Sequence, residues 1–188
     1  MKYSDGTFAG AFFFIAAFQF VLGLLVSEAL YPGYSVSENY ISDLGIGPSA
    51  MIFNGSVFLL GVLMMVGTFF LQRAFHNKVF TVFLILNAVG SMGVGVFPEN
   101  LEPMHSIAAL LIFLFGGLSI LYSSRLMKRP FSLIGVLLGI LSYVALTLFM
   151  VHQYVGLGVG GMERLVVYPI LVWAIGFSGY LCAFPEKS

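Results

Sequence analysis

The sequence predicts an all-α, polytopic membrane protein that forms a single domain over residues 1–188. Three observations lead there: 60% of the residues are hydrophobic, only 9% are charged, and the apolar residues gather in six long runs. A soluble domain carries roughly 25% charged residues, and a chain of this length cannot hide so much apolar surface from water. Each run approaches the ~20 residues with which a helix crosses a bilayer. The six predicted transmembrane helices are Phe8–Leu30, Ala50–Leu71, Val79–Val96, Met104–Tyr122, Phe131–Val151 and Leu165–Phe184.

The charged residues sort by sign between the two sides of this arrangement. The loops after the first, third and fifth spans, with the helix ends beside them, hold six acidic residues and one basic residue, Arg164. Because lysine and arginine in short loops mark the cytoplasmic side, the sequence predicts cytoplasmic N- and C-termini in a multi-pass protein of the cell membrane. The formal net charge is zero, which gives no indication of nucleic acid binding, so the predicted partner is the lipid bilayer.

The first external loop, residues 31–49, carries the signals of a short interfacial helix. Ser35 followed by Glu38 fits a capping box at a helix start, and Gly45 is a typical helix end. On such a helix the apolar residues at a spacing of four would lie on the membrane surface. They are Val36, Tyr40 and Leu44.

Asn39 and Asp43 share the neighbouring face of that predicted helix, because they are also four residues apart. Two interpretations follow from this spacing. Either the two side chains are solvated on a surface helix, or they point inward over the bundle as a lid or as ligands.

The second external loop leads into a histidine in the first turn of the fourth span. The dipole at a helix start favours a neutral imidazole at His105, which is the form that binds a metal or acts as a base. Glu99 lies six residues before it. The alternative is an interfacial histidine that hydrogen-bonds to a loop carbonyl oxygen.

The third external loop ends in a charged pair. His152 lies at the end of the fifth span, and the glycines of residues 156–161 predict a flexible connector. Glu163 and Arg164 then open the last helix. An arginine beside the membrane costs free energy unless it is paired or reaches the lipid surface, so we expect Arg164 to bind lipid phosphate or an external acid such as Asp43 or Glu99.

The candidate site residues all lie on the predicted external side. The candidates for catalysis are Asp43, Glu99, His105 and Arg164. The candidates for ligand binding are Asn39, Asp43, His105, His152, Glu163 and Arg164. Asp43 and His105 are the candidates for a metal site, and the sequence specifies no cofactor. No charged residue lies in the middle of a span, which argues against a proton relay or an ion pump.

Three short motifs lie at the predicted external ends of the spans. Tyr40-Ile-Ser-Asp-Leu-Gly45 follows the first span, Gly95-Val-Phe-Pro-Glu99 with His105 leads into the fourth, and Gly161-Met-Glu-Arg164 opens the last. Together they resemble the prokaryotic integral membrane family called domain of unknown function 998. The resemblance implies no activity. The residues that match the family pattern are Ser42, Asp43, Gly45, Pro98, His105, Glu163 and Arg164.

Three classes of function fit these observations. The first is a membrane protein whose polar, acidic external cluster is structural or binds a ligand or partner, such as a lipid or small molecule. The second is a metal-dependent or acid/base hydrolase that acts on a lipid or isoprenoid at the outer leaflet. The third is a small transporter, and a haem held by His105 and His152 is a remaining alternative.

Overall fold

The computed structural model describes residues 3–183, in which all regular secondary structure is helical. Six helices are each long and apolar enough to span a membrane, which confirms the predicted all-α fold with six spans. They are α1 (Asp5–Leu30), α2 (Ala50–Phe75), α3 (Lys78–Val96), α4 (Met104–Ser123), α5 (Phe131–Met150) and α6 (Gly158–Ala183). The predicted end of the last span at Phe184 falls outside the described residues.

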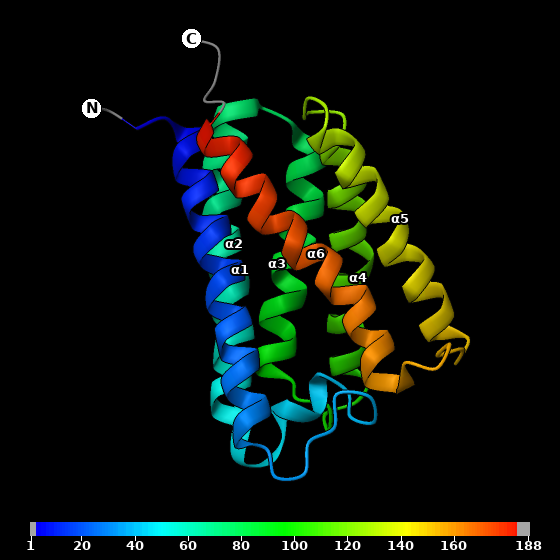
Figure 1. Cartoon of the computed structure of the whole chain (residues 1–188). Coiled ribbons are helices and arrows are strands. Elements are labelled where there is room, and N and C mark those ends of the chain that lie inside the picture. The colour runs from blue at the N-terminus through cyan, green and yellow to red at the C-terminus, as the bar shows by residue number, and fades with distance from the viewer. Residues whose placement is uncertain (1–2, 184–188) are drawn as a thin grey trace.

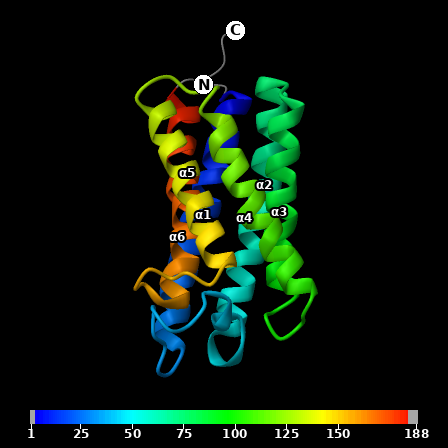
Figure 2. The same cartoon turned by 90° about the vertical axis from the view of Figure 1, so that its right-hand side faces the viewer.

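The helices form one bundle in which neighbours along the chain run antiparallel and pack side by side (Figures 1 and 2). α6 closes the bundle by packing against both α1 and α5. Figure 1 shows it crossing the bundle obliquely. α6 is the most deeply buried of the six helices. Its first turns lie among the loops at one end of the bundle, and its middle lies in the core.

The two ends of the bundle differ in charge. The start of α1 and the end of α6 lie at one end, beside the α2–α3 and α4–α5 connections (Figure 1). We call this the basic end; its basic residues are Arg73, Lys78, Arg125, Lys128 and Arg129. The opposite end, called the acidic end, consists of loops 31–49, 97–103 and 151–157 with the adjoining helix turns. Which end faces the cytoplasm stays a prediction.

Polar caps start some helices earlier than hydropathy predicts. Ser4 Oγ accepts a hydrogen bond from the backbone N–H of Thr7 at 3.1 Å, and α1 begins at Asp5 rather than at Phe8. Asn77 caps α3 in the same way. Such caps satisfy backbone donors that the first turn of a helix leaves without a partner.

The glycine-rich segment before the last predicted span is helical from Gly158 onward, so the prediction of a flexible connector is wrong for this part of it. α6 begins at Gly158 and not at Leu165. The reason is a contact with the first loop: the N–H of Gly160 donates to Ser37 O at 3.1 Å, and a Cβ at Gly160 would overlap the carbonyl oxygen of Asn39. Glycine permits this backbone-to-backbone packing, which holds the segment as the first turn of α6.

Loop 31–49 does not contain the predicted two-turn interfacial helix. It forms a turn near Ser37, followed by two short 3₁₀ helices, η1 (Ser42–Gly45) and η2 (Gly47–Ser49). Leu44, expected on the membrane surface, is completely buried against the bundle. The loop therefore covers the acidic end of the bundle instead of lying along the membrane surface.

Side chains explain why that helix does not form. Asn39 Oδ1 accepts from the backbone N–H of Ser35 at 3.0 Å, and Asp43 Oδ2 accepts from the backbone N–H of Tyr40 at 2.9 Å. Asparagine and aspartate compete in this way with the backbone bonds of a helix. The predicted capping box of Ser35 and Glu38 is therefore replaced by two local turns.

Some polar residues within the helices bond to a neighbouring helix, whereas others, such as Ser91 and Thr147, bond within their own helix. Gln19 Nε2 donates to Ser56 O at 2.9 Å and joins α1 to α2. Asn87 Nδ2 donates to Ile112 O at 2.9 Å and joins α3 to α4. A Cβ at Gly90 would come within 2.7 Å of a backbone oxygen of α4, so this glycine serves close helix packing.

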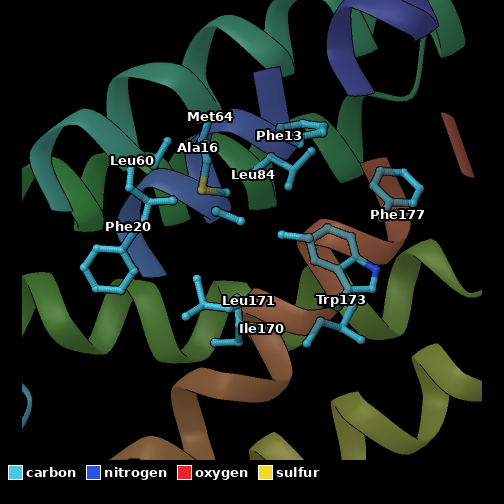
Figure 3. Close-up of a cluster of buried hydrophobic side chains, with 14 of the residues drawn as sticks. Phe13, Ala16, Phe20, Leu60, Met64, Leu84, Ile170, Leu171, Trp173 and Phe177 are labelled. Atoms are coloured by element: carbon cyan, nitrogen blue, oxygen red, sulfur yellow. The ribbon is translucent and has the colours of Figure 1, made fainter. Parts of the chain in front are cut away.

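The centre of the bundle packs around a tryptophan on α6 (Figure 3). The ring of Trp173 stacks on that of Phe177 with 5.0 Å between centroids, and the ring of Phe80 meets both nearly at right angles. The indole N–H donates to Ser123 Oγ at 2.8 Å, which satisfies its donor in the core. These rings close the centre of the bundle toward the basic end.

Candidate functional site

Arg164 lies near the start of α6 and joins three elements of the acidic end. Its Nη2 donates to Glu28 Oε1 near the end of α1, at 2.6 Å. Its Nη1 donates to Val36 O at 3.1 Å and to a carbonyl oxygen of its own helix. The prediction that Arg164 pairs with an acidic residue is confirmed, but the partner is Glu28 and neither Asp43 nor Glu99.

Tyr34 completes the contacts of this arginine. Its hydroxyl accepts from Arg164 Nη2 at 2.6 Å and donates to Tyr40 O at 2.9 Å, while the guanidinium lies 5.5 Å from the centroid of its ring. Burial raises the pKa of Tyr34 to about 12, so the hydroxyl keeps its proton and can donate. Arg164 and Tyr34 together hold loop 31–49 against α1 and α6.

Asp43 and Glu99 bring two carboxyl groups together at the acidic end. Asp43 Oδ2 accepts from Asn39 Nδ2 at 3.0 Å and from the N–H of Tyr40, so the predicted proximity of Asn39 and Asp43 is confirmed without the helix. Burial and the adjacent Asp43 raise the pKa of Glu99 to about 7, and the hydroxyl of Ser42 acts in the opposite direction. Glu99 Oε2 is buried without a hydrogen-bond partner among the described residues.

Glu163 points into the bundle, away from its neighbour Arg164, because consecutive helix residues point about 100° apart. Its side chain is 7% exposed. Oε2 accepts from the backbone N–H of Ile41 at 2.5 Å, across 122 positions of sequence. Oε1 has no hydrogen-bond partner within residues 3–183.

His105 is also buried, at 6% exposed, in the first turn of α4. Its Nδ1 lies 2.8 Å from Phe97 O. Because a carbonyl oxygen can only accept, Nδ1 carries the hydrogen and Nε2 is an acceptor in the neutral ring. This confirms the interpretation of a histidine that hydrogen-bonds to a loop carbonyl oxygen, and it leaves Nε2 without a partner among the described residues.

A cavity lies inside the bundle next to these groups. Its empty volume is about 720 Å³, including the space open to its surroundings. The residues that line it at the acidic end include Ile41, Ser42, His105 and Glu163. The structure thus brings His105 and Glu163 to one cavity and places Asp43 and Glu99 beside Ser42.

Toward the basic end the lining of the cavity becomes mainly apolar. The large side chains there include Phe20, Met64, Leu171 and Trp173, which Figure 3 shows on α1, α2 and α6. Met64 lies near the middle of α2, so the cavity reaches about halfway through the bundle. It therefore has a polar end, at His105 and Glu163, and a mainly apolar end in which Asn87 and Ser91 are the polar lining residues.

His152 lies apart from this group. It is exposed, its Nδ1 lies 3.0 Å from the hydroxyl of Tyr154, and it does not line the cavity. The geometry therefore gives no support to a haem held by His105 and His152. Residues 3–183 hold no group of three or more His, Cys, Asp or Glu side chains that could bind a metal ion, so Asp43 and His105 lack a third ligand of this kind.

Sequence reasoning missed Glu28, Tyr34 and Ile41 as members of the site. For Glu28 a signal exists, since a lone arginine beside the membrane needs a partner and Glu28 ends the first span on the same side. Tyr34 and the backbone of Ile41 contribute through the path of loop 31–49. That path depends on contacts between residues far apart in sequence, so no local pattern indicates it.

Comparison with known proteins yields one match. The family model described as "Protein of unknown function (DUF998)" matches residues 14–179. That range includes every candidate residue of the acidic end. No curated protein matches the chain, and no solved structure does.

Proposed function

Since this chain belongs to the DUF998 family, as its motifs predict, we propose a function from its own geometry: it is a membrane protein that binds an amphiphilic molecule in its central cavity. The observation that carries the proposal is the lining of that cavity, which includes His105 and Glu163 at the acidic end and is mainly apolar toward the middle of the bundle. A polar head beside His105 and Glu163 and a hydrocarbon tail beside Leu171 and Trp173 would each meet a matching surface.

The size of the cavity supports this proposal. Protein interiors pack densely and contain few voids larger than a water molecule. The volume open to the centres of water-sized spheres is about 70 Å³ here, whereas a single water needs about 10–15 Å³ by the same measure. An apolar tail would gain dispersion contacts with lining atoms that otherwise face empty space.

Trp173 supplies the test, because it is the only tryptophan of the chain and lines the cavity while only 5% exposed. Purified protein in detergent micelles is titrated with a dodecyl alcohol that carries bromine on its two terminal carbons. Bromine quenches indole fluorescence at short range. We expect quenching that saturates with increasing probe, as filling of a single site requires.

A matched pair of variants separates binding in the cavity from partition into the micelle. Ala109→Phe places a ring inside the cavity, whereas Ala11→Phe places the same ring on the exposed face of α1. We expect Ala109→Phe to raise the half-saturating concentration of the probe at least about tenfold. Ala11→Phe should leave that concentration unchanged. Quenching that never saturates in the unmodified protein would contradict the proposal, even if Ala109→Phe failed to fold.

Catalysis on the bound molecule is a second candidate, favoured by one observation. The carboxyl group of Glu163 and the imidazole of His105 both line the polar end of the cavity, and these are groups that act as general acids and bases. Mass spectrometry of lipids incubated with the protein and with His105→Gln checks it. A product formed only by the unmodified protein would support catalysis, and lipids recovered unchanged from both would contradict it.

Transport, the remaining alternative from the sequence, has weaker support. The cavity reaches Met64 near the middle of α2, as a substrate pathway would. Toward the basic end, however, the rings of Phe80, Trp173 and Phe177 pack against one another. A transporter would have to separate these rings, so binding is the function that this geometry supports best.

A further inference from the structure

We infer that the head group of the ligand is a protonated amine, so that the cavity takes a long-chain ammonium amphiphile. This inference rests on the proposed function and adds the chemical class of its ligand. It follows from the hydrogen-bonding groups that face the cavity and from the charges around them.

The polar end of the cavity offers hydrogen-bond acceptors without matching donors. Glu163 Oε1 has no partner among the described residues, and its side chain is more than nine-tenths buried. His105 Nε2 accepts in the neutral ring, because Nδ1 donates to Phe97 O. An ammonium group carries only donors and therefore suits either atom. A carboxylate or phosphate head would bring more acceptors to a site that already has them.

Charge favours the same head group. Glu163 feels the negative charges of Asp43 and Glu99 as well as the positive charge of Arg164. Arg164, the only lysine or arginine of the described residues at the acidic end, donates to Glu28 and to none of these three. A buried carboxylate is costly unless a positive partner offsets it. A cationic head beside Glu163 would provide that partner and form a charge-assisted hydrogen bond.

The apolar end of the cavity explains why the ligand needs a chain as well as a charge. An ammonium group held at Glu163 would direct its substituent toward Leu171 and Trp173 on the same helix. A small polyamine would leave this lining uncovered or place a second charge against it. Residues 3–183 also lack a group of side chains that could hold a metal ion, so a bare divalent cation does not suit the site.

Three probes with one chain test the head group. Each has a dodecyl chain brominated on its two terminal carbons, and the heads are an ammonium, an alcohol and a carboxylate. Quenching of Trp173 is measured for each probe at neutral pH in a non-ionic detergent. We expect the ammonium probe to reach half-saturation at a concentration about tenfold below that of the alcohol, with the carboxylate weakest.

A matched pair of variants assigns the preference to the cavity. Glu163→Gln removes the charge yet keeps an oxygen that accepts from Ile41, and Glu38→Gln removes the same charge from an exposed position of the acidic end. We expect Glu163→Gln to bring the half-saturating concentration of the ammonium probe to that of the alcohol. Glu38→Gln should leave the tenfold difference in place.

The outcomes separate this inference from the proposed function. If the three probes saturate at equal concentrations, or if Glu38→Gln acts as strongly as Glu163→Gln, the amine head group is wrong while binding in the cavity stands. If no probe gives saturable quenching, the proposed function itself fails. Should Glu163→Gln not fold, the ranking of the three heads on the unmodified protein still decides the inference.

Discussion

The guanidinium of Arg164 and the carboxylate of Glu28 lie 2.6 Å apart and join the start of α6 to the end of α1. Their side chains are 5% and 22% exposed, so the pair is largely shielded from water. Arg73 and Asp5 form a second pair at 3.0 Å, but their side chains are 57% and 27% exposed. The same chemistry thus occurs once in a shielded and once in a more solvated setting.

This contrast predicts unequal effects of two equal substitutions. Arg164→Gln leaves Glu28 without its charged partner in a shielded position, and we expect it to lower the free energy of unfolding by about 3 kcal/mol. Arg73→Gln breaks an exposed pair, and we expect it to cost less than about 1 kcal/mol. Thermal unfolding in detergent, followed by the fluorescence of Trp173, measures both. Equal shifts would show that Arg164 does not hold loop 31–49 in place.

The contact between α6 and the first loop gives a second prediction. A Cβ at Gly160 would overlap the carbonyl oxygens of Asn39 and Val36. These are backbone atoms, which cannot move aside as the end of a flexible side chain can. We therefore expect Gly160→Ala to destabilise the protein by about 3 kcal/mol. The control is Gly176→Ala on the same helix, where a Cβ meets nothing within 4 Å. That substitution should be neutral or stabilise by up to about 1 kcal/mol, and a similar loss in both would contradict the close packing.

The carboxyl pair at the acidic end predicts how stability depends on pH. Burial and the adjacent Asp43 raise the pKa of Glu99 from 4.5 to about 7. Between those values the folded protein binds a proton that the unfolded chain has lost, so stability falls as pH rises from about 4.5 to about 7 and then levels off. Because Glu99 is only half buried, solvent screening limits this contribution to about 1 kcal/mol.

Glu99→Gln isolates that contribution. We expect the variant to be more stable than the unmodified protein above pH 7 and to lose this part of the pH dependence. The charge of Glu102 also acts on Glu99, so the quantity to compare is the difference between the two unfolding curves at each pH. Glu38→Gln, at an exposed position, should leave the slope unchanged. A difference curve that is flat from pH 4.5 to 7 would contradict the raised pKa of Glu99.

The six helices could be predicted from the sequence because each depends on a local property. A run of about 20 apolar residues has few alternatives to a spanning helix, and this holds for α2 to α5 with only small shifts of their ends. The start of α6 could not be predicted in this way. Gly158 and Gly160 favour a loop by themselves, and the helix forms there because loop 31–49 packs against them.

The candidate site was predictable in its residues but less so in its contacts. Charge sorting selects Asp43, Glu99 and Glu163 for one end of the bundle, and they lie there. Their partners depend on tertiary structure, as the bond from Ile41 to Glu163 shows, since 122 positions separate the two residues. Nothing in the sequence places Trp173 and Glu163 at the same cavity, because that follows from the tilt and packing of α6.

The sorting of charge also predicts the orientation of the bundle, and a single cysteine makes this testable. Cys182 is the only cysteine of the chain, is exposed, and lies next to the last residue of α6 at the basic end. Because basic loops stay in the cytoplasm, a membrane-impermeant maleimide should label it only after intact cells are permeabilised.

Asn100→Cys in a Cys182→Ser background reports on the opposite end. Asn100 is exposed in loop 97–103 of the acidic end, so this variant should react in intact cells at the rate it shows after permeabilisation. Neither substitution changes a lysine or arginine, so the distribution of basic residues that sets the orientation is preserved. Labelling of Cys182 but not of residue 100 in intact cells would show that the bundle has the opposite orientation. The cavity would then have its polar end toward the cytoplasm, and an amphiphile would have to reach Glu163 from that side.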